Sequence, residues 1–286
     1  MKRLDLNVTN KFLSILVSGQ PGSGKTSFMG SAALDPRSAP VLHVDVSGNP
    51  ESLLRLRKQP DVIRLGPLTD LDAVFDFFLQ KQPANHALVT QFGCTPGYKT
   101  LILDGITAIQ RKSFDDVMGY TPGKPGAGVP NPEWPHYNRS LAQMIEIATL
   151  AFQRLTGIHV LVSCLEKTEK RYMVPGEEKS SYPFHRPALK GQAQRELPGE
   201  AKCVIRLAHV TTITPDTLKS IESTYGVPKG TTPNWYSVGQ FVHTKNAYAK
   251  DQHNFGIEYM PNPTVKKLLD LLESNAQARQ QANQTQ

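Results

Sequence analysis

The chain has 286 residues, which is enough for one large α/β domain or two small ones. Hydrophobic residues make up 39% of it, which suffices for a core, and the sequence holds no run of about 18 apolar residues, so no membrane-spanning helix is expected. The formal net charge of +7 favours a polyanionic partner, with nucleic acid ahead of membrane.

The N-terminus and the cysteines both indicate the cytoplasm. Residues 1–5, Met-Lys-Arg-Leu-Asp, lack the apolar stretch of a signal peptide. The three cysteines, Cys94, Cys164 and Cys203, are widely spaced and odd in number, which fits neither a metal site nor a disulfide framework. We therefore expect a protein of a reducing compartment.

The first predicted elements surround a phosphate-binding sequence. An apolar strand is predicted over residues 13–18 and a helix over 27–34. Between them lies a complete G-x-x-x-x-G-K-[ST] pattern, so the predicted nucleotide-binding residues are Gly19, Pro21, Gly22, Ser23, Gly24, Lys25, Thr26 and Ser27. A glycine-rich turn that binds nothing is the alternative, which the flanking strand and helix disfavour.

This pattern carries a specific chemistry for ATP and Mg²⁺. Glycines let the backbone curl so that successive N–H groups point at phosphate oxygens, and the new helix adds its positive end. Lys25 is expected to reach the β- and γ-phosphates as a catalytic cation, and the Thr26 hydroxyl to ligate Mg²⁺.

The next elements alternate between strand and helix. Strands are predicted over residues 41–46 and 62–65, with a short helix over 51–58 between them. Thr69 is the predicted cap of a further helix, with Asp72 three residues on. This alternation favours a mostly parallel sheet with helices on both faces.

A strong strand at residues 100–104 ends in Asp104, which has the pattern of a Walker B element. Its carboxylate is expected to hold Mg²⁺ as a catalytic and metal-binding group, on a strand beside the phosphate loop. The following residue is Gly105 rather than Glu, which argues against the Asp-Glu pair of most AAA+ machines and many helicases.

The second half of the chain adds a helix at residues 138–155, strands at 159–163, 203–207 and 236–244, and a small amphipathic helix at 264–272. Residues 120–135 are rich in glycine and proline and predict a mobile loop, and residues 167–190 predict a second, basic one. We expect one domain over residues 1–272, with antiparallel additions towards its C-terminus, followed by a disordered Gln/Asn-rich tail at 273–286.

Residues 101–109, Leu-Ile-Leu-Asp-Gly-Ile-Thr-Ala-Ile, resemble the Walker B strand and following helix of the RecA/RadA recombinase core, and the order of the predicted parts agrees. Residues 187–191, 196–199 and 244–251 are similar to a branch of phage-encoded ATPases that includes ATP-dependent single-strand annealing proteins. The resemblance covers roughly residues 10–272 and implies a RecA-like P-loop ATPase.

The resemblance also implies partners. Segments at residues 119–135 and 166–190 occupy the places of the two loops that line the DNA channel. Single-stranded DNA, a homo-oligomeric filament or ring with ATP at its interfaces, a single-strand-binding protein and the host-cell cytoplasm follow as expectations. Lys245 and Lys250 lie where basic residues reach the neighbour's γ-phosphate, with ordinary surface lysines as the alternative.

The second basic segment has the residue types that hold single strands, cations for phosphates and aromatic faces for bases. The predicted DNA-binding residues are Lys167, Lys170, Arg171, Arg186 and Lys190, interleaved with Tyr172, Tyr182 and Phe184. On residue types alone, a solvated β-hairpin of mixed charge is the favoured interpretation. The place of the segment, where the resembled recombinase core holds DNA, shifts the preference to DNA binding.

Two departures from the recombinase pattern concern hydrolysis. Ser47 stands where a glutamate usually polarises the attacking water, so that Asp45 or Glu51 would have to substitute or hydrolysis would be slow. In the resembled family, the strand before the second DNA loop often ends in a glutamine that links the γ-phosphate to that loop. This chain has Ser163-Cys164 at that place. The histidines show no ligand spacing and are interpreted as structural.

The sequence thus favours an ATPase that anneals single-stranded DNA in phage-type recombination. The first alternative is a P-loop motor or regulator acting on a protein partner in phage replication or packaging. A small-molecule kinase is the second alternative, and it would need an acceptor site and a lid that no segment marks convincingly.

Overall fold

The computed structural model describes residues 11–48, 50–120, 133–172, 181–225, 236–244 and 247–284. Lys245 and most of the predicted mobile loop at 120–135 lie outside these residues. Within the described part of the chain, no helix is long and apolar enough to cross a membrane.

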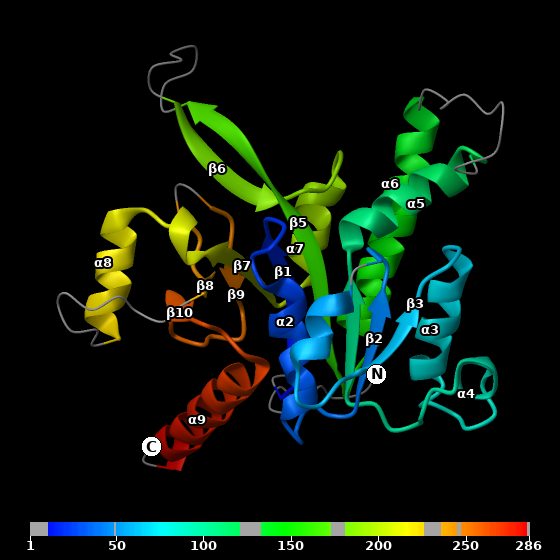
Figure 1. Cartoon of the computed structure of the whole chain (residues 1–286), viewed down its shortest axis with the longest axis horizontal. Coiled ribbons are helices and arrows are strands. Elements are labelled where there is room, and N and C mark those ends of the chain that lie inside the picture. Colours follow the sequence, from blue (N-terminus) through cyan, green and yellow to red (C-terminus); the bar gives the residue numbers. More distant parts are fainter. Residues whose placement is uncertain are drawn as a thin grey trace.

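One large sheet organises the molecule (Figure 1). Its parallel strands run in the order β7, β1, β5, β4, β2, β3, and antiparallel strands β8, β9 and β10 extend it beyond and alongside β7. The bounds are β1 (Ser14–Gly19), β2 (Val41–Asp45), β3 (Asp61–Arg64), β4 (Thr100–Asp104), β5 (His159–Tyr172), β6 (Ser181–Pro187), β7 (Cys203–His209), β8 (Ser237–Gln240), β9 (Lys250–Asp251) and β10 (Tyr259–Pro261). The predicted fold class, mostly parallel with antiparallel additions towards the C-terminus, is confirmed.

The strand that carries Asp104 ends beside the phosphate loop, as expected, but it is not the immediate neighbour of β1. Strand β5 lies between β1 and β4 and pairs with both. The order of strands along the sheet depends on crossover connections, which a strand's own sequence does not encode.

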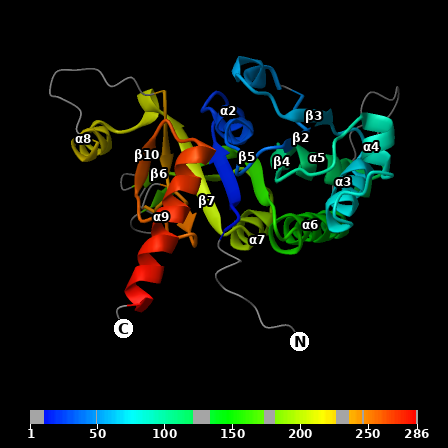
Figure 2. The ribbon, with the colours of Figure 1, turned by 90° about the horizontal axis from the view of Figure 1, so that it is seen from below.

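Helices cover both faces of the sheet, and Figure 2 shows α2 and α6 on opposite sides. The bounds are α2 (Lys25–Gly30), α3 (Thr69–Leu79), α4 (Ala87–Phe92), α5 (Ile106–Val117), α6 (Trp134–Thr149), α7 (Ala193–Glu200), α8 (Pro215–Thr224) and α9 (Val265–Gln284), with short helical turns at Ser31–Leu34, Pro50–Arg55, Leu150–Arg154 and Val210–Thr212. Successive strand residues point to opposite faces, so Leu16 joins one buried apolar cluster while Ile15 and Val17 join the other.

The predicted basic loop at 167–190 is largely a hairpin. Strand β5 leaves the parallel sheet after Leu165 and continues, paired antiparallel with β6, from Glu166 opposite Pro187 to Tyr172 opposite Ser181. Its two strands project beyond the end of the parallel sheet (Figure 1). The hairpin therefore shares its first strand with the centre of the sheet.

Several predicted boundaries also shift. The helix predicted from residue 138 starts at Trp134, and Thr69 is the first residue of α3 rather than its cap, which is Leu68 without a side-chain cap bond. The strand predicted to reach residue 244 ends at Gln240. Helix α9 runs through most of the segment expected to be a disordered tail. That segment is rich in Ala and Gln, which favour helix as well as solubility.

All three cysteines are buried. Cys164 and Cys203 lie in the sheet at 0% exposure, and Cys94 follows α4 at 4%. Burial raises the pKa of each thiol, to about 11 for Cys164. They act as small apolar side chains.

Candidate functional site

The phosphate-binding sequence forms a tight loop between β1 and α2. Gly22 and Gly24 have φ of +78° and +92°, which side chains other than glycine rarely adopt. A Cβ on Gly19 would come within 2.4 Å of Ser23 Oγ and 2.5 Å of the Leu207 carbonyl oxygen. The glycines of the pattern are therefore required by this backbone.

Lys25 folds back onto the loop. Its Nζ donates to the carbonyl oxygens of Gly19 at 2.7 Å and Gln20 at 2.8 Å, while Ser23 N–H donates to Gln20 at 3.2 Å. Burial lowers the pKa of Lys25, against the attraction of Asp104 and other anionic groups. The buried Ser23 Oγ has no hydrogen-bond partner among the described residues. A ligand with several acceptor oxygens would satisfy these donors.

Asp104 lies directly beside the loop. Thr26 Oγ1 donates to its Oδ2 at 2.7 Å, and Ser163 Oγ donates to its Oδ1 at 2.5 Å. Burial raises the pKa of Asp104, but contacts with His43, Ser163 and Thr26 outweigh it and hold that pKa below its ordinary value. A hydroxyl and an ionised carboxylate that meet here are a donor set that suits Mg²⁺.

His43, which the sequence alone suggested to be merely structural, is a neighbour of Asp104. It is 0% exposed on β2, and its Nε2 lies 3.5 Å from Asp104 Oδ2. Neither ring nitrogen has a hydrogen bond to the described residues. His43 and Asp45 are two residues apart on one strand and so share a face. This spacing is the feature of the sequence that could have indicated a role for His43 in the site.

The candidates for activating water differ in position. Asp45 is buried and pairs in register with Asp104, its Oδ1 accepting from Gly48 N–H at 2.8 Å and Ser47 Oγ at 3.3 Å. Glu51 is exposed in a helical turn. Of the two proposed substitutes, Asp45 is therefore the one adjacent to the Asp104 strand.

A second acidic residue near the loop was not predicted from the sequence. Glu166 has a 1% exposed side chain that pairs with Arg206 through contacts of 2.7 and 3.2 Å, and with His185 Nδ1 at 2.9 Å. Since Glu166 is on β5 and Arg206 on β7, the pair spans the carboxyl end of β1. In sequence, Glu166 was only one charge in a mixed segment.

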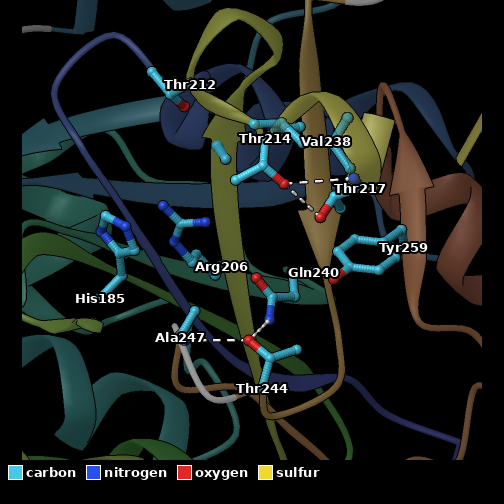
Figure 3. A pocket seen from close by; sticks show the side chains of 12 residues that line it. His185, Arg206, Thr212, Thr214, Thr217, Val238, Gln240, Thr244, Ala247 and Tyr259 are labelled. Atoms are coloured by element: carbon cyan, nitrogen blue, oxygen red, sulfur yellow. Dashed lines mark hydrogen bonds between the residues drawn. The ribbon is translucent and has the colours of Figure 1, made fainter. Parts of the chain in front are cut away.

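Arg206 borders two cavities. One, of about 260 Å³, is lined by Gln20–Ser23 of the loop together with Glu166, Arg206 and His209. The other, of about 230 Å³, lies towards β8 and is shown in Figure 3, where Arg206 stands between His185 and the residues around Gln240. A cavity lined in part by polar residues therefore adjoins the phosphate-binding loop on the side of β7.

The predicted DNA-binding residues all lie at the hairpin or its base, but most are engaged. Lys167 Nζ is 2.9 Å from Glu169 Oε1, and Arg186 pairs with the same carboxylate. The Arg171 guanidinium carbon lies 3.4 Å from the Phe184 ring centre, and Lys190 Nζ lies 5.6 Å from that of Phe114. The side chain of Lys170 is exposed and forms no hydrogen bond or ion pair with the described residues.

The aromatic residues of this segment fit a base-stacking role less well than expected. Phe184 is 1% exposed, so it cannot stack on a base in this conformation. The side chains of Tyr172 and Tyr182 lie outside the described residues.

Lys250 lies away from the nucleotide loop. Strand β9 pairs with the first residues of β7, at the opposite end of that strand from the loop. Lys250 Nζ donates to the carbonyl oxygens of Gly199 at 2.7 Å and Ala201 at 2.8 Å, at the end of α7. Within this chain it is a helix-terminating cation.

Comparison with known proteins identifies the class. A family model described as "AAA domain" matches residues 11–253, and the chain belongs to that family. It is an ATPase with a nucleotide-binding P-loop core. Gly105 follows Asp104 in place of a glutamate, so the chain lacks the Asp-Glu pair of most AAA+ machines. This difference does not contradict the family match.

No curated protein matches the chain significantly. Among solved structures, it is similar to the "ATPase Domain of G40P" (10% identity, TM-score 0.44, covering 91% of this chain and 84% of that one). It is also similar to "a prototypical ATPase from the type III secretion system of pathogenic bacteria" (12%, 0.41, 77% and 58%) and to a "DnaB-Like Replicative Helicase" (12%, 0.38, 86% and 55%).

Proposed function

We propose that this ATPase uses Mg-ATP to control binding of single-stranded DNA by the β5–β6 hairpin, and that it promotes annealing in phage-type recombination. One observation carries the proposal. Strand β5 contains Ser163, which bonds Asp104 in the nucleotide site, and continues as the strand that carries Lys167, Lys170 and Arg171. Both sites therefore share one continuous strand.

The residues around the loop divide the work on the nucleotide. Lys25 would exchange its carbonyl contacts for phosphate oxygens, Thr26 and Asp104 would hold Mg²⁺, and the loop N–H groups would bind phosphate. Mg²⁺ neutralises charge on the terminal phosphates when bound. With no glutamate at Ser47, water activation falls to Asp45, and we expect slow hydrolysis.

Assembly into a ring or filament with ATP at subunit interfaces is part of the proposal. Lys245 keeps its predicted role towards the neighbouring subunit's γ-phosphate. Lys250 would have to give up its contacts with α7 to act in the same way.

A protein partner is the second candidate, and a specific observation favours it. Lys167 and Arg186 both pair with Glu169, which cancels one of their two charges and leaves the described hairpin with fewer unpaired cations than its sequence indicates. A motor or regulator that acts on a protein needs no phosphate-binding arm.

ATP turnover and DNA binding together test the proposal. We expect ATP to strengthen binding of a labelled single-stranded oligonucleotide. Since coupling between two sites is reciprocal for binding, the oligonucleotide should tighten ATP binding in turn and so raise ATP hydrolysis at subsaturating ATP. Lys25→Ala should lose both effects while its melting temperature stays unchanged. ATP hydrolysis with no DNA binding at any salt concentration would favour the protein-partner alternative.

A further inference from the structure

An exposed tyrosine stands beside the nucleotide loop. Tyr236 immediately precedes β8, and the residue is 56% exposed. Its Oη donates to the Gly22 carbonyl oxygen at 2.8 Å. A Cβ on Gly24 would lie 3.7 Å from the ring carbon Cε1. The ring therefore lies against the residues that form the phosphate cradle.

The ring is held in place before any ligand arrives. The backbone N–H of Tyr236 donates to Asn262 Oδ1 at 2.8 Å, and its carbonyl accepts from Val210 N–H at 3.1 Å. The His209 ring meets the tyrosine ring edge-on, with centroids 4.8 Å apart and planes at 86°. A pre-positioned aromatic ring loses little conformational entropy when a ligand binds to it.

The order of strands gives the direction in which a nucleotide lies. Asp104 and Ser163 are on β4 and β5, on one side of β1, and they mark the end of the loop where Mg²⁺ and the terminal phosphates belong. Strands β7 and β8 lie on the other side of β1. The base, at the far end of the nucleotide from the terminal phosphates, is thereby directed towards β8 and Tyr236.

We propose that Tyr236 binds the base of the nucleotide by stacking, with its hydroxyl group bonded to Gly22 to fix the ring. This deepens the proposed function, because it rests on the same nucleotide site and adds the group that recognises the part of ATP beyond the phosphates. Stacking accepts any flat base, so the ligand class is nucleoside triphosphates, with the larger purines bound best.

Calorimetry with two ligands separates base binding from phosphate binding. Mg-ATP and inorganic tripolyphosphate are titrated into the wild type, Tyr236→Ala, Tyr236→Phe and Lys25→Ala. We expect Tyr236→Ala to raise the Kd of ATP about tenfold and leave that of tripolyphosphate nearly unchanged. Tyr236→Phe keeps the ring but loses the bond to Gly22, so it should weaken ATP binding much less than Tyr236→Ala does.

The controls make the outcomes distinct. If Tyr236→Ala raised the Kd of ATP and of tripolyphosphate equally, the residue would act only through the Gly22 bond. If the Kd of ATP did not change, the residue would not touch the base. Either result overturns the proposal. Tyr236→Leu repeats the test if the alanine variant unfolds, because it keeps apolar bulk without an aromatic face. Lys25→Ala should weaken both ligands, and its failure to do so would instead contradict the nucleotide site itself.

Discussion

At the scale of single residues, Asp104 carries the sharpest expectation. Asp104→Asn removes a charge from the metal but little from the phosphate cradle, so we expect the turnover number to fall by about a hundredfold or more while the Kd of ATP changes only a few-fold. Steady-state ATPase assays and calorimetry measure the two quantities. A normal turnover number would show that Asp104 does not hold the metal.

Lys250 gives a second expectation, on stability. Lys250→Met leaves the carbonyls at the end of α7 without their cation and should lower the free energy of unfolding by about 1–2 kcal/mol. Lys266→Met is the control, because Lys266 makes only an exposed pair with Asp270. Urea denaturation compares the two variants with the wild type.

The role in trans predicts a different result for the same residue. If Lys250 served a neighbouring subunit, its variant would fold normally, and mixing with Lys25→Ala would restore turnover, because some interfaces would combine two intact groups. Recovery of ATPase activity across mixing ratios would therefore contradict the structural role.

The sequence identified candidate residues that lie within local motifs, but it did not identify residues that only the fold brings together. Lys25, Thr26 and Asp104 were assigned because their spacing follows a known phosphate-binding chemistry. His43 approaches Asp104 from a neighbouring strand, and Glu166 meets Arg206 across β1. Such contacts depend on strand order and register, which local pattern does not determine.

At the scale of elements, the cations of the β5–β6 hairpin divide into those that pair with Glu169 and those that do not. Replacing Lys170 and Arg171 with Ala should lower the slope of log K against log salt for single-stranded DNA by about 0.7 for each phosphate left without its cation. Replacing Lys167 and Arg186 should change it less, because both already pair with Glu169 and are less available to phosphate. Fluorescence anisotropy across a salt series measures the slopes.

The result that contradicts this expectation is equally clear. Identical slopes for both double variants and the wild type would show that the hairpin is a solvated surface and that DNA, if bound, lies elsewhere. Lys266→Ala on α9 serves as the control for a general loss of positive charge.

Elements were predictable where periodicity was strong. Strands β1, β2, β4 and β7 were located closely because each is a short apolar run between turns. The segment of the hairpin was expected to be a basic loop, with a solvated β-hairpin as the other interpretation, because its charged residues hide the two-residue alternation of a strand. The C-terminal extension of α9 lacks an apolar face, so composition suggested disorder where helix propensity prevailed.

At the scale of the whole molecule, two buried histidines tie distant segments to the start of β1. His159 Nδ1 accepts from Leu13 N–H at 3.0 Å, and His253 Nε2 accepts from Ser14 N–H at 3.1 Å. Burial lowers their pKa values to about 4 and about 3, so both rings are neutral in the fold. Protonation of either ring in the native state would break its bond to β1.

Stability should therefore fall in acid. The unfolded chain takes up protons on these rings below pH of about 6.5 and the folded chain does not, so the stabilisation is complete above that pH and is lost as pH falls towards 4. For His159 alone the loss approaches roughly 3 kcal/mol. Denaturation at pH 7 and pH 5 should show it. In a His159→Gln, His253→Gln variant, the glutamine amides still accept a hydrogen bond but do not titrate, so the difference in stability between pH 7 and pH 5 should shrink. An undiminished difference would show that other groups cause it.

The burial of all three thiols gives the chain three built-in reporters of local opening. A thiol reagent can modify Cys94, Cys164 or Cys203 only when the surrounding structure opens, and each reports on a different region: the segment after α4, the centre of the sheet, and the strand that bears Arg206. The rate at which each becomes labelled, with and without ATP, would map where the nucleotide tightens the molecule. Lys170→Cys would add an exposed thiol on the hairpin, whose immediate reaction sets the reference rate for a fully accessible site.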